Sequence, residues 1–135
     1  YAKETSDEFK RKQEDLLTET LKKIDIVICT ALIPGKKAPI IIKEDMIDNM
    51  NSGSIIYDLA AIQGGNTALT KVDEIVDRKG IKIMGENNIL NKLPTSASNL
   101  YAKNVFNFVS NLYDKENNKI NINLEDEIIE KTLIK

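Results

Sequence analysis

The chain has 135 residues, of which 41% are hydrophobic and 30% charged, a composition that predicts a folded globular domain and excludes a disordered segment. Its formal net charge is −2 and its lysines and arginines are scattered, which argues against nucleic acid as a partner. It has no histidine, a single cysteine and no apolar run near the roughly 20 residues of a membrane-spanning helix, which excludes a histidine-dependent hydrolase, an internal disulfide and a spanning segment within these residues.

A helix is predicted over about residues 6–23, close to the start of the chain. Thr5 or Ser6 can cap it, and Asp7 and Glu8 lie in its first turn, where negative charge is favourable. Its apolar residues keep helical spacing, so one face is apolar and the rest charged. Because no initiator methionine precedes this helix, we interpret the chain as a fragment of a longer polypeptide.

Three apolar runs rich in β-branched residues predict three buried strands, over about 24–30, 54–60 and 81–85. A short helix is predicted over about 43–50, between the first two strands, and residues 72–77 are expected to be a connector. Strands separated by crossovers form a parallel sheet with right-handed connections. The predicted fold class is therefore α/β, with helices flanking a parallel sheet.

Each predicted strand ends in a small or polar loop. The first leads into Thr-Ala-Leu-Ile at 30–33 and a Pro-Gly turn, the second into Gln-Gly-Gly-Asn at 63–66, and the third into Glu-Asn-Asn at 86–88. In open α/β sheets, ligands bind at the carboxyl ends of the strands. We therefore expect the three loops to share one edge of the sheet and to form a binding site there.

Two side chains within the predicted strands are interpreted as structural. Asp58 needs a partner among its apolar neighbours, and we favour a structural acceptor for a loop amide over a ligand contact. Cys29 lies in an apolar run, where a packed, inert thiol is favoured over a nucleophile.

The last third of the chain predicts one long helix and then a β segment. The helix is expected over about 97–113, with its apolar side chains facing inward and Ser96 or Ser98 as its cap. Residues 120–124 alternate between apolar and polar, as half-exposed strands do, which predicts a C-terminal β segment over about 119–134.

Several spaced motifs in this chain recur together in one known family. They are TALIPGK at 30–36, AP at 38–39, DLAA at 58–61, QGGN at 63–66 and LPT at 93–95, followed by Ser98, Tyr101 and Ala102. Together they resemble the alpha subunit of proton-translocating NAD(P) transhydrogenase and, less closely, alanine dehydrogenase, in order from Tyr1 to about Glu127. The resemblance implies that residues 1–114 are the C-terminal half of a Rossmann NAD(H)-binding domain. Residues 115–135 would be a β extension returning toward a neighbouring domain.

The resemblance also implies which residues contact the cofactor. Ala31 and Leu32 belong to the loop that lies against NAD in the family, and Tyr1 would end a mobile loop that closes over the nucleotide. Other residues would line the nicotinamide side or stand beside these. The full implied set is Tyr1, Thr30, Ala31, Leu32, Leu59, Ala60, Asn88 and Ile89. No catalytic side chain and no metal ligand is implied.

Ile62 separates the two related activities. Alanine dehydrogenase has a catalytic aspartate at the position before Gln63, because oxidative deamination moves a proton as well as a hydride. Hydride transfer between two nicotinamides needs only two rings held close in a site that excludes water. Isoleucine at this position favours the second chemistry.

The resemblance implies a function only within a larger complex. NADH bound here would pass hydride to NADP(H) held by an NADP-binding partner domain, and a membrane domain would couple this transfer to proton translocation. We expect a soluble domain peripheral to the membrane, on the cytoplasmic side in bacteria or in the mitochondrial matrix or another organelle, as part of a homodimer. The chain alone, without the glycine-rich half, is expected to be inactive. An alanine dehydrogenase-like oxidoreductase and a non-catalytic Rossmann-type assembly module remain alternatives.

Overall fold

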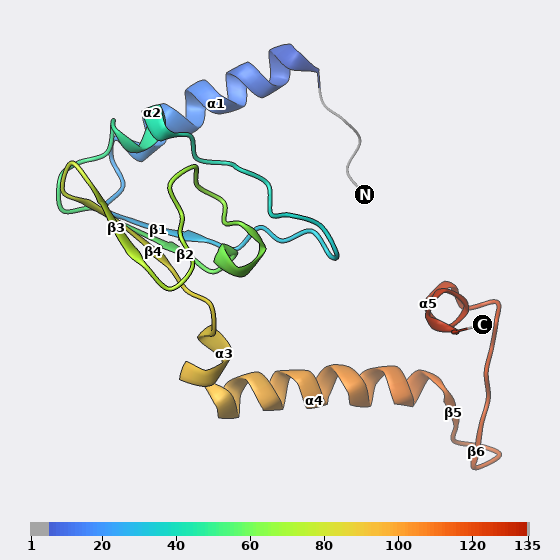
Figure 1. Cartoon of the computed structure of the whole chain (residues 1–135). Helices are drawn as coiled ribbons and strands as arrows, with labels where there is room; N and C mark the ends of the chain where they lie inside the picture. The colour runs from blue at the N-terminus through green and yellow to red at the C-terminus, as the bar shows by residue number, and fades with distance from the viewer. Residues whose placement is uncertain (1–5, 135) are drawn as a thin grey trace. The chain divides into compact units, whose positions relative to one another are not determined.

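The structure is a computed structural model that describes residues 6–134, and it divides into two compact units (Figure 1). The first unit comprises the described residues up to Ile89, and the second begins at Leu90. The elements of the first unit are α1 (Asp7–Leu21), β1 (Ile26–Cys29), α2 (Glu44–Ile47), β2 (Ile55–Asp58), the 3₁₀ turn η1 (Ala61–Gln63), β3 (Ile75–Arg78) and β4 (Ile81–Gly85).

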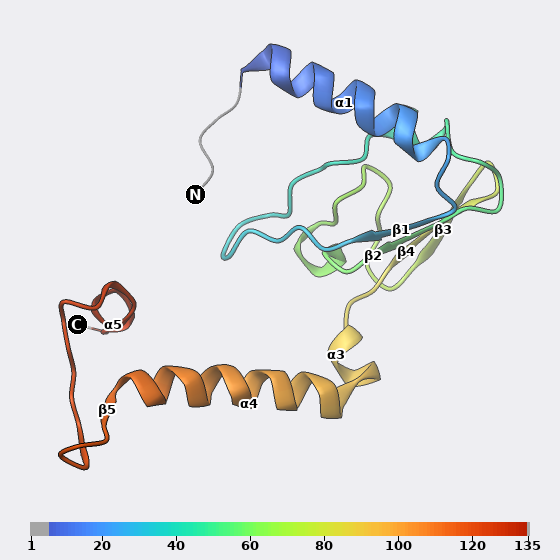
Figure 2. The same cartoon turned by 180° about the vertical axis from the view of Figure 1, so that it is seen from behind.

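The first unit is an α/β sheet of four strands in the order β1-β2-β4-β3. The pairs β1–β2 and β2–β4 are parallel, as predicted, whereas β3 runs antiparallel to β4. Both views show α1 and α2 on the same face of the sheet (Figures 1 and 2). The prediction of a mainly parallel, Rossmann-like α/β fold is confirmed.

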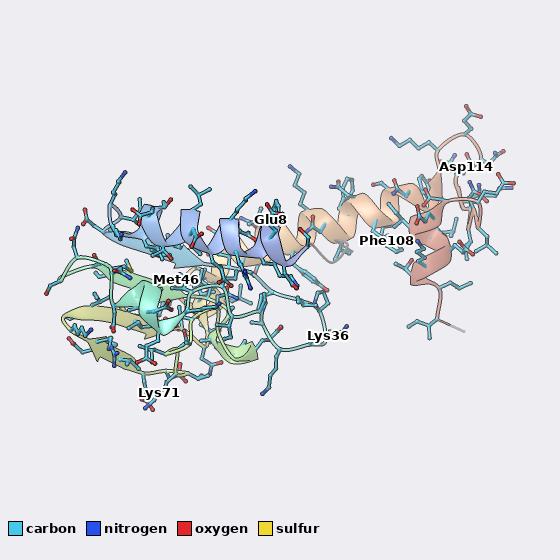
Figure 3. All side chains as sticks on the ribbon, turned by 90° about the horizontal axis from the view of Figure 1, so that it is seen from above. Glu8, Lys36, Met46, Lys71, Phe108 and Asp114 are labelled. Atoms are coloured by element: carbon cyan, nitrogen blue, oxygen red, sulfur yellow. The ribbon has the colours of Figure 1, made fainter. Side chains whose placement is uncertain are left out.

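The core lies between that face of the sheet and the two helices. Met46 and Ile47 of α2 are buried against Ile56 of β2 and Ile83 of β4, and the last turn of α1 contributes Leu21. Figure 3 labels Met46 on the short helix. Each such side chain contributes about 1.5–3 kcal/mol by leaving water, so this cluster positions the helices and strands relative to one another. The predicted inward face of the helix at 43–50 is confirmed.

One strand was missed, because residues 72–77 were expected to be a connector. Ile75–Arg78 instead pairs with β4, and the two are joined by Lys79 and Gly80, which both have positive φ, at 54° and 81°. Such two-residue turns match the natural twist of a hairpin. Arg78 then binds Asp48 at 2.7 Å, which attaches the strand to the end of α2. The short, charged sequence concealed this strand, because only two of its four residues are apolar.

The second unit contains mostly helix. Its elements are α3 (Ile89–Lys92), which begins at the last residue of the first unit, α4 (Pro94–Asn111), the two-residue strands β5 (Tyr113–Asp114) and β6 (Lys119–Ile120), and α5 (Glu127–Thr132). The expected serine cap of the long helix was wrong, because Pro94 occupies the first turn, where its fixed φ suits a helix and its missing N–H is not needed.

The predicted C-terminal β segment was also wrong over most of its length. Only Lys119–Ile120 forms a strand, whereas Glu127–Thr132 is helical. Asp126 explains the helix, because its carboxylate accepts the backbone N–H groups of Ile128 at 2.8 Å and Ile129 at 3.2 Å, which is a helix cap. This local bond outweighs the weak alternation that precedes it.

The inward apolar face expected on the long helix is exposed in the structure. Most of its large apolar side chains are open to solvent, namely Leu100, Tyr101, Val105, Phe106 and Val109. The periodic pattern correctly predicts an amphipathic helix, but it does not say which segment covers the apolar side. Within residues 6–134, no helix combines the length and apolar character needed to cross a bilayer.

Candidate functional site

The three parallel strands end level with one another. In the register of the sheet, Cys29 pairs with Asp58, and Asp58 pairs with Gly85. The loops that begin at Thr30, Leu59 and Glu86 therefore leave from the same edge, and Figure 1 shows the loop after β1 and the turn η1 at that end of the sheet. The sequence prediction that three loops share one edge is confirmed.

Asp58 holds the second of these loops in place from inside the protein. Its side chain is 0% exposed, and its carboxylate accepts the backbone N–H of Ala60 at 2.9 Å and of Asn66 at 2.6 Å. The hydroxyl of Thr70 donates a third bond at 2.6 Å. These bonds compensate the burial of the carboxylate. The interpretation of Asp58 as a structural acceptor for loop amides is confirmed.

Asn66 joins the loops that follow β1 and β2. Its side-chain oxygen accepts the Ala31 N–H at 2.9 Å, and its side-chain nitrogen donates to the Ala31 carbonyl at 2.9 Å and to that of Pro39 at 2.9 Å. Sequence analysis placed this asparagine in a motif but gave it no role. Its signal was available, since a polar amide directly after two glycines can bond backbone on both sides. Because both backbone groups of Ala31 are bonded to Asn66, the start of the first loop is rigidly held.

Gln63 fixes the tip of the first loop. With its amide nitrogen facing the loop, the side chain donates to the carbonyls of Lys36 at 2.9 Å and Ile33 at 3.2 Å. Its backbone carbonyl accepts the Ala38 N–H at 2.8 Å. The Pro-Gly turn is thereby attached to η1 at several points.

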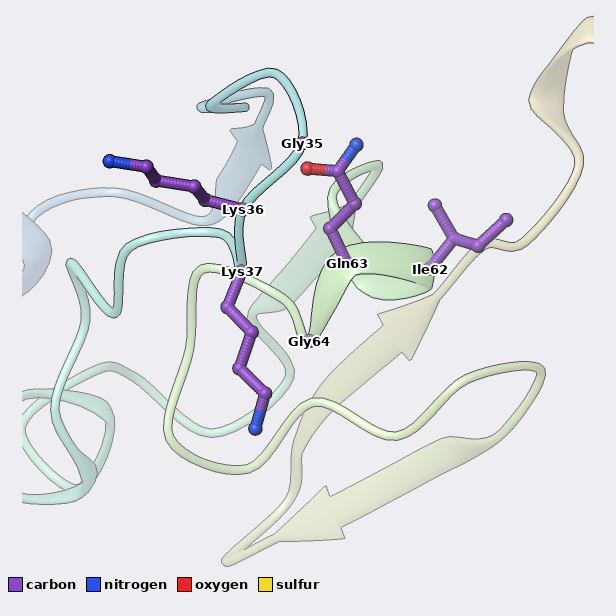
Figure 4. Close-up of a pocket in the computed structure, with 6 residues that line it drawn as sticks. All are labelled: Gly35, Lys36, Lys37, Ile62, Gln63 and Gly64. Carbon is purple, nitrogen blue, oxygen red and sulfur yellow. The ribbon is translucent and has the colours of Figure 1, made fainter.

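A pocket of about 430 Å³ lies between these two loops (Figure 4). Its lining residues are Gly35, Lys36, Lys37, Ile62, Gln63 and Gly64. Figure 4 shows the two lysine side chains leaving one loop in different directions, while Ile62 projects from the facing turn. Figure 3 shows Lys36 at the tip of its loop. The pocket thus combines fixed backbone with cationic and apolar side chains.

The residues implied as cofactor contacts differ in exposure. Thr30 and Asn88 are exposed and Leu32 is 49% exposed, whereas Ala60 is 0% exposed. The remaining described ones, Ala31, Leu59 and Ile89, are half-buried. All seven follow the strand ends within a few residues. Tyr1 lies outside the described residues.

Cys29 is buried at the end of β1. Burial raises the pKa of its thiol to about 11, and the nearby Asp58 carboxylate adds to the shift. A thiol with this pKa is protonated at neutral pH and is a poor nucleophile. The prediction of an inert packed thiol is confirmed.

A mainly parallel sheet with a loop-lined pocket at its carboxyl edge defines the open α/β class, in which ligands bind at that edge. The profile of the family described as "Alanine dehydrogenase/PNT, C-terminal domain" matches residues 2–135, so the chain belongs to this family.

Individual relatives agree with this membership. The chain is similar to the NAD(P) transhydrogenase alpha subunit (its first polypeptide) of Rhodospirillum rubrum, with 43% identity over 134 residues that cover 99% of this chain and 35% of the relative. Similarity to alanine dehydrogenase 1 of Staphylococcus aureus is 30% over 103 residues, which cover 73% of this chain and 28% of the relative. The chain thus spans about a third of the length of these relatives.

The fold is also found in a solved structure. The crystal structure of transhydrogenase from Sinorhizobium meliloti matches with a TM-score of 0.70 and 37% identity, over 93% of this chain and 35% of that one. This match covers most of both units and confirms the resemblance to transhydrogenase.

Proposed function

We propose that this chain is the C-terminal half of the NAD(H)-binding domain of a proton-translocating NAD(P) transhydrogenase. The observation that carries the proposal is the common edge of β1, β2 and β4, where motif residues of three loops lie together. The similarity to a transhydrogenase alpha subunit at 43% identity over 99% of the chain supports the same assignment. We call the longer polypeptide that would contain this chain the parent protein.

The residues at this edge fit the nicotinamide end of a dinucleotide. Thr30, Leu32 and Asn88 are accessible and would contact NAD(H), with Leu59 and Ile89 beside them. Ala31 and Ala60 would contribute small side chains and a backbone held by Asn66 and Asp58. Tyr1 is proposed to close over the nucleotide. NAD(H) supplies the hydride when bound, and the protein orients its ring.

Ile62 favours transhydrogenation over deamination. Its side chain is 63% exposed at the pocket, beside the loop that carries Leu32. Hydride transfer between two nicotinamides moves no proton to or from a side chain, so an aliphatic residue there excludes water without interfering. An alanine dehydrogenase activity would need an acid or base at this point, and Ile62 provides neither.

The sheet supports the proposal that residues 1–114 are half of a domain. β1 is an edge strand of parallel pairs, and its Ile26 and Ile28 are both 65% exposed. Parallel sheets are normally covered on both faces and continue at such apolar edges. We propose that strands of the parent protein pair with β1 and that residues 115–135 pack on its neighbouring domain.

The proposed activity requires partners. NADP(H) would be held by an NADP-binding domain, and a membrane domain would couple hydride transfer to proton movement, with this chain peripheral to the membrane. A homodimer is also proposed, because the exposed apolar side chains of α4 supply a surface for association. A non-catalytic assembly module is the second candidate, favoured by the same surface.

The test is made on the purified parent protein with its NADP-binding partner domain. We expect NADH binding and hydride transfer to an NADP analogue, and no alanine-dependent reduction of NAD. Alanine-dependent reduction would establish the dehydrogenase instead. Absence of NADH binding would leave the assembly module. Calorimetry of the isolated chain adds a check, since micromolar NADH affinity without the other half would contradict the half-domain assignment.

A further inference from the structure

Charge is distributed unevenly along the loops at the carboxyl edge. Residues 30–42 and 59–70 contain two lysines, Lys36 and Lys37, and no aspartate or glutamate, in a chain whose net charge is −2. Acidic side chains reappear at Glu44 and Asp73, beyond both loops. The edge that holds the proposed cofactor site is therefore cationic on a chain that is otherwise acidic.

Both lysines are exposed and have no acidic partner. In the part of the chain that the structure describes, no carboxylate forms an ion pair with either amine, although lysines elsewhere in the first unit, such as Lys43 and Lys71, are paired. Their backbone is nevertheless fixed, because Lys36 N–H donates to the Ile33 carbonyl at 3.1 Å and its carbonyl accepts from Gln63. Two unpaired cations are thus presented from a rigid turn.

Apolar side chains adjoin these cations. Leu32 is exposed on the same loop, and exposed Ile62 projects from the facing turn across the pocket (Figure 4). We call Leu32, Lys36, Lys37 and Ile62 the Lys36 surface. Specific protein interfaces combine an apolar centre with a charged rim, and this surface has both.

We infer that the Lys36 surface is the docking surface for the NADP-loaded partner domain, which would present acidic side chains to Lys36 and Lys37 and an apolar patch to Leu32 and Ile62. This inference rests on the proposed function and adds the place of contact and its charge. Hydride transfer requires the two nicotinamides to meet, so the partner must approach the edge where the first one is bound. Opposite charge at the rim of such a contact speeds encounter and fixes orientation.

The test is charge reversal in the parent protein. Lys36→Glu/Lys37→Glu is compared with Lys115→Glu/Lys119→Glu, a matched control that reverses two exposed lysines of the second unit. Two quantities are measured: the affinity for NADH by fluorescence titration, and the concentration of NADP-loaded partner domain that gives half-maximal hydride transfer. We expect the first variant to weaken the partner's apparent affinity about tenfold at low ionic strength, with the difference shrinking as salt is added.

Each outcome separates this inference from the function on which it rests. Unchanged NADH affinity, weakened partner affinity and restoration by Lys36→Arg/Lys37→Arg would support the docking surface. Unchanged partner affinity, equal weakening by the control, or loss of NADH affinity instead would overturn it while leaving the proposed function intact. No NADH binding and no hydride transfer by the unsubstituted parent protein would overturn both.

Discussion

Replacing Asp58 by asparagine tests whether a buried carboxylate holds the carboxyl edge together. One oxygen of Asp58 accepts the Ala60 N–H, and the other accepts both the Asn66 N–H and the Thr70 hydroxyl. An asparagine can place its oxygen at only one of these two positions. Its NH₂ group then faces a donor, most favourably the Ala60 N–H, because that choice breaks a single bond.

The magnitude follows from these contacts. The opposed donor pair costs about 1–3 kcal/mol, and each of the two remaining bonds loses about 1 kcal/mol when its acceptor becomes neutral. Part of this loss is offset because a buried charge no longer has to be desolvated. We therefore expect Asp58→Asn to destabilise the first unit by about 2–4 kcal/mol.

Urea unfolding of the parent protein measures the free energy, and amide hydrogen exchange shows where it is lost. The amides of Ala60 and Asn66 should exchange much faster in Asp58→Asn, while those of β1 should change less. Asp25→Asn is the control, because Asp25 is exposed and its replacement should change stability by less than about 0.5 kcal/mol. A loss below about 1 kcal/mol for Asp58→Asn, with unchanged exchange, would refute the role assigned to the carboxylate.

Three further predictions concern the first unit. Gly65→Ala should destabilise it by more than about 2 kcal/mol, because the added Cβ would lie 2.5 Å from Thr70 Cβ and 2.8 Å from Asp58 Oδ2. Gly53→Ala, also at positive φ but with nothing within 4 Å, should lose only about 1 kcal/mol in urea unfolding, and equal losses would contradict the steric argument. Cys29, with its pKa raised to about 11, should react with iodoacetamide about 100-fold more slowly than in urea, and rapid labelling of the folded protein would show that the thiol is accessible. Hydrogen bonds from Arg78 and Lys79 lower the pKa of Asp48, so its stabilising effect is complete above the unfolded pKa of about 4 and is lost as pH falls below it; Asp48→Asn should flatten the acid limb of the urea midpoint, and an unchanged limb would argue against this ion pair.

Local sequence signals predicted the elements that depend on nearby residues. The β-branched runs that became β1, β2 and β4 are buried on one face, and their parallel order follows from the crossovers between them. The cap of α1 was also predictable, since Ser6 accepts the Phe9 N–H at 3.3 Å. These features need only propensity and spacing.

Features that depend on distant residues were not predictable. β3 forms because β4 provides a partner and Asp48 provides an ion pair 30 positions away, and neither leaves a pattern within the strand itself. The bond between Asn66 and Ala31 spans 35 positions in the same way. The site residues were indicated by resemblance, whereas the network that holds their backbone emerged only from the structure.

The hairpin of β3 and β4 gives the sheet a direction of growth. On that side the last strand is four residues long, carries Asp77 and Arg78, and is clamped to the end of α2. Short, charged margins of this kind discourage further pairing. Any additional strand must therefore join at β1, so recombinant versions that begin near α1 should associate through that side, and solubility screens would benefit from polar substitutions at Ile26 or Ile28.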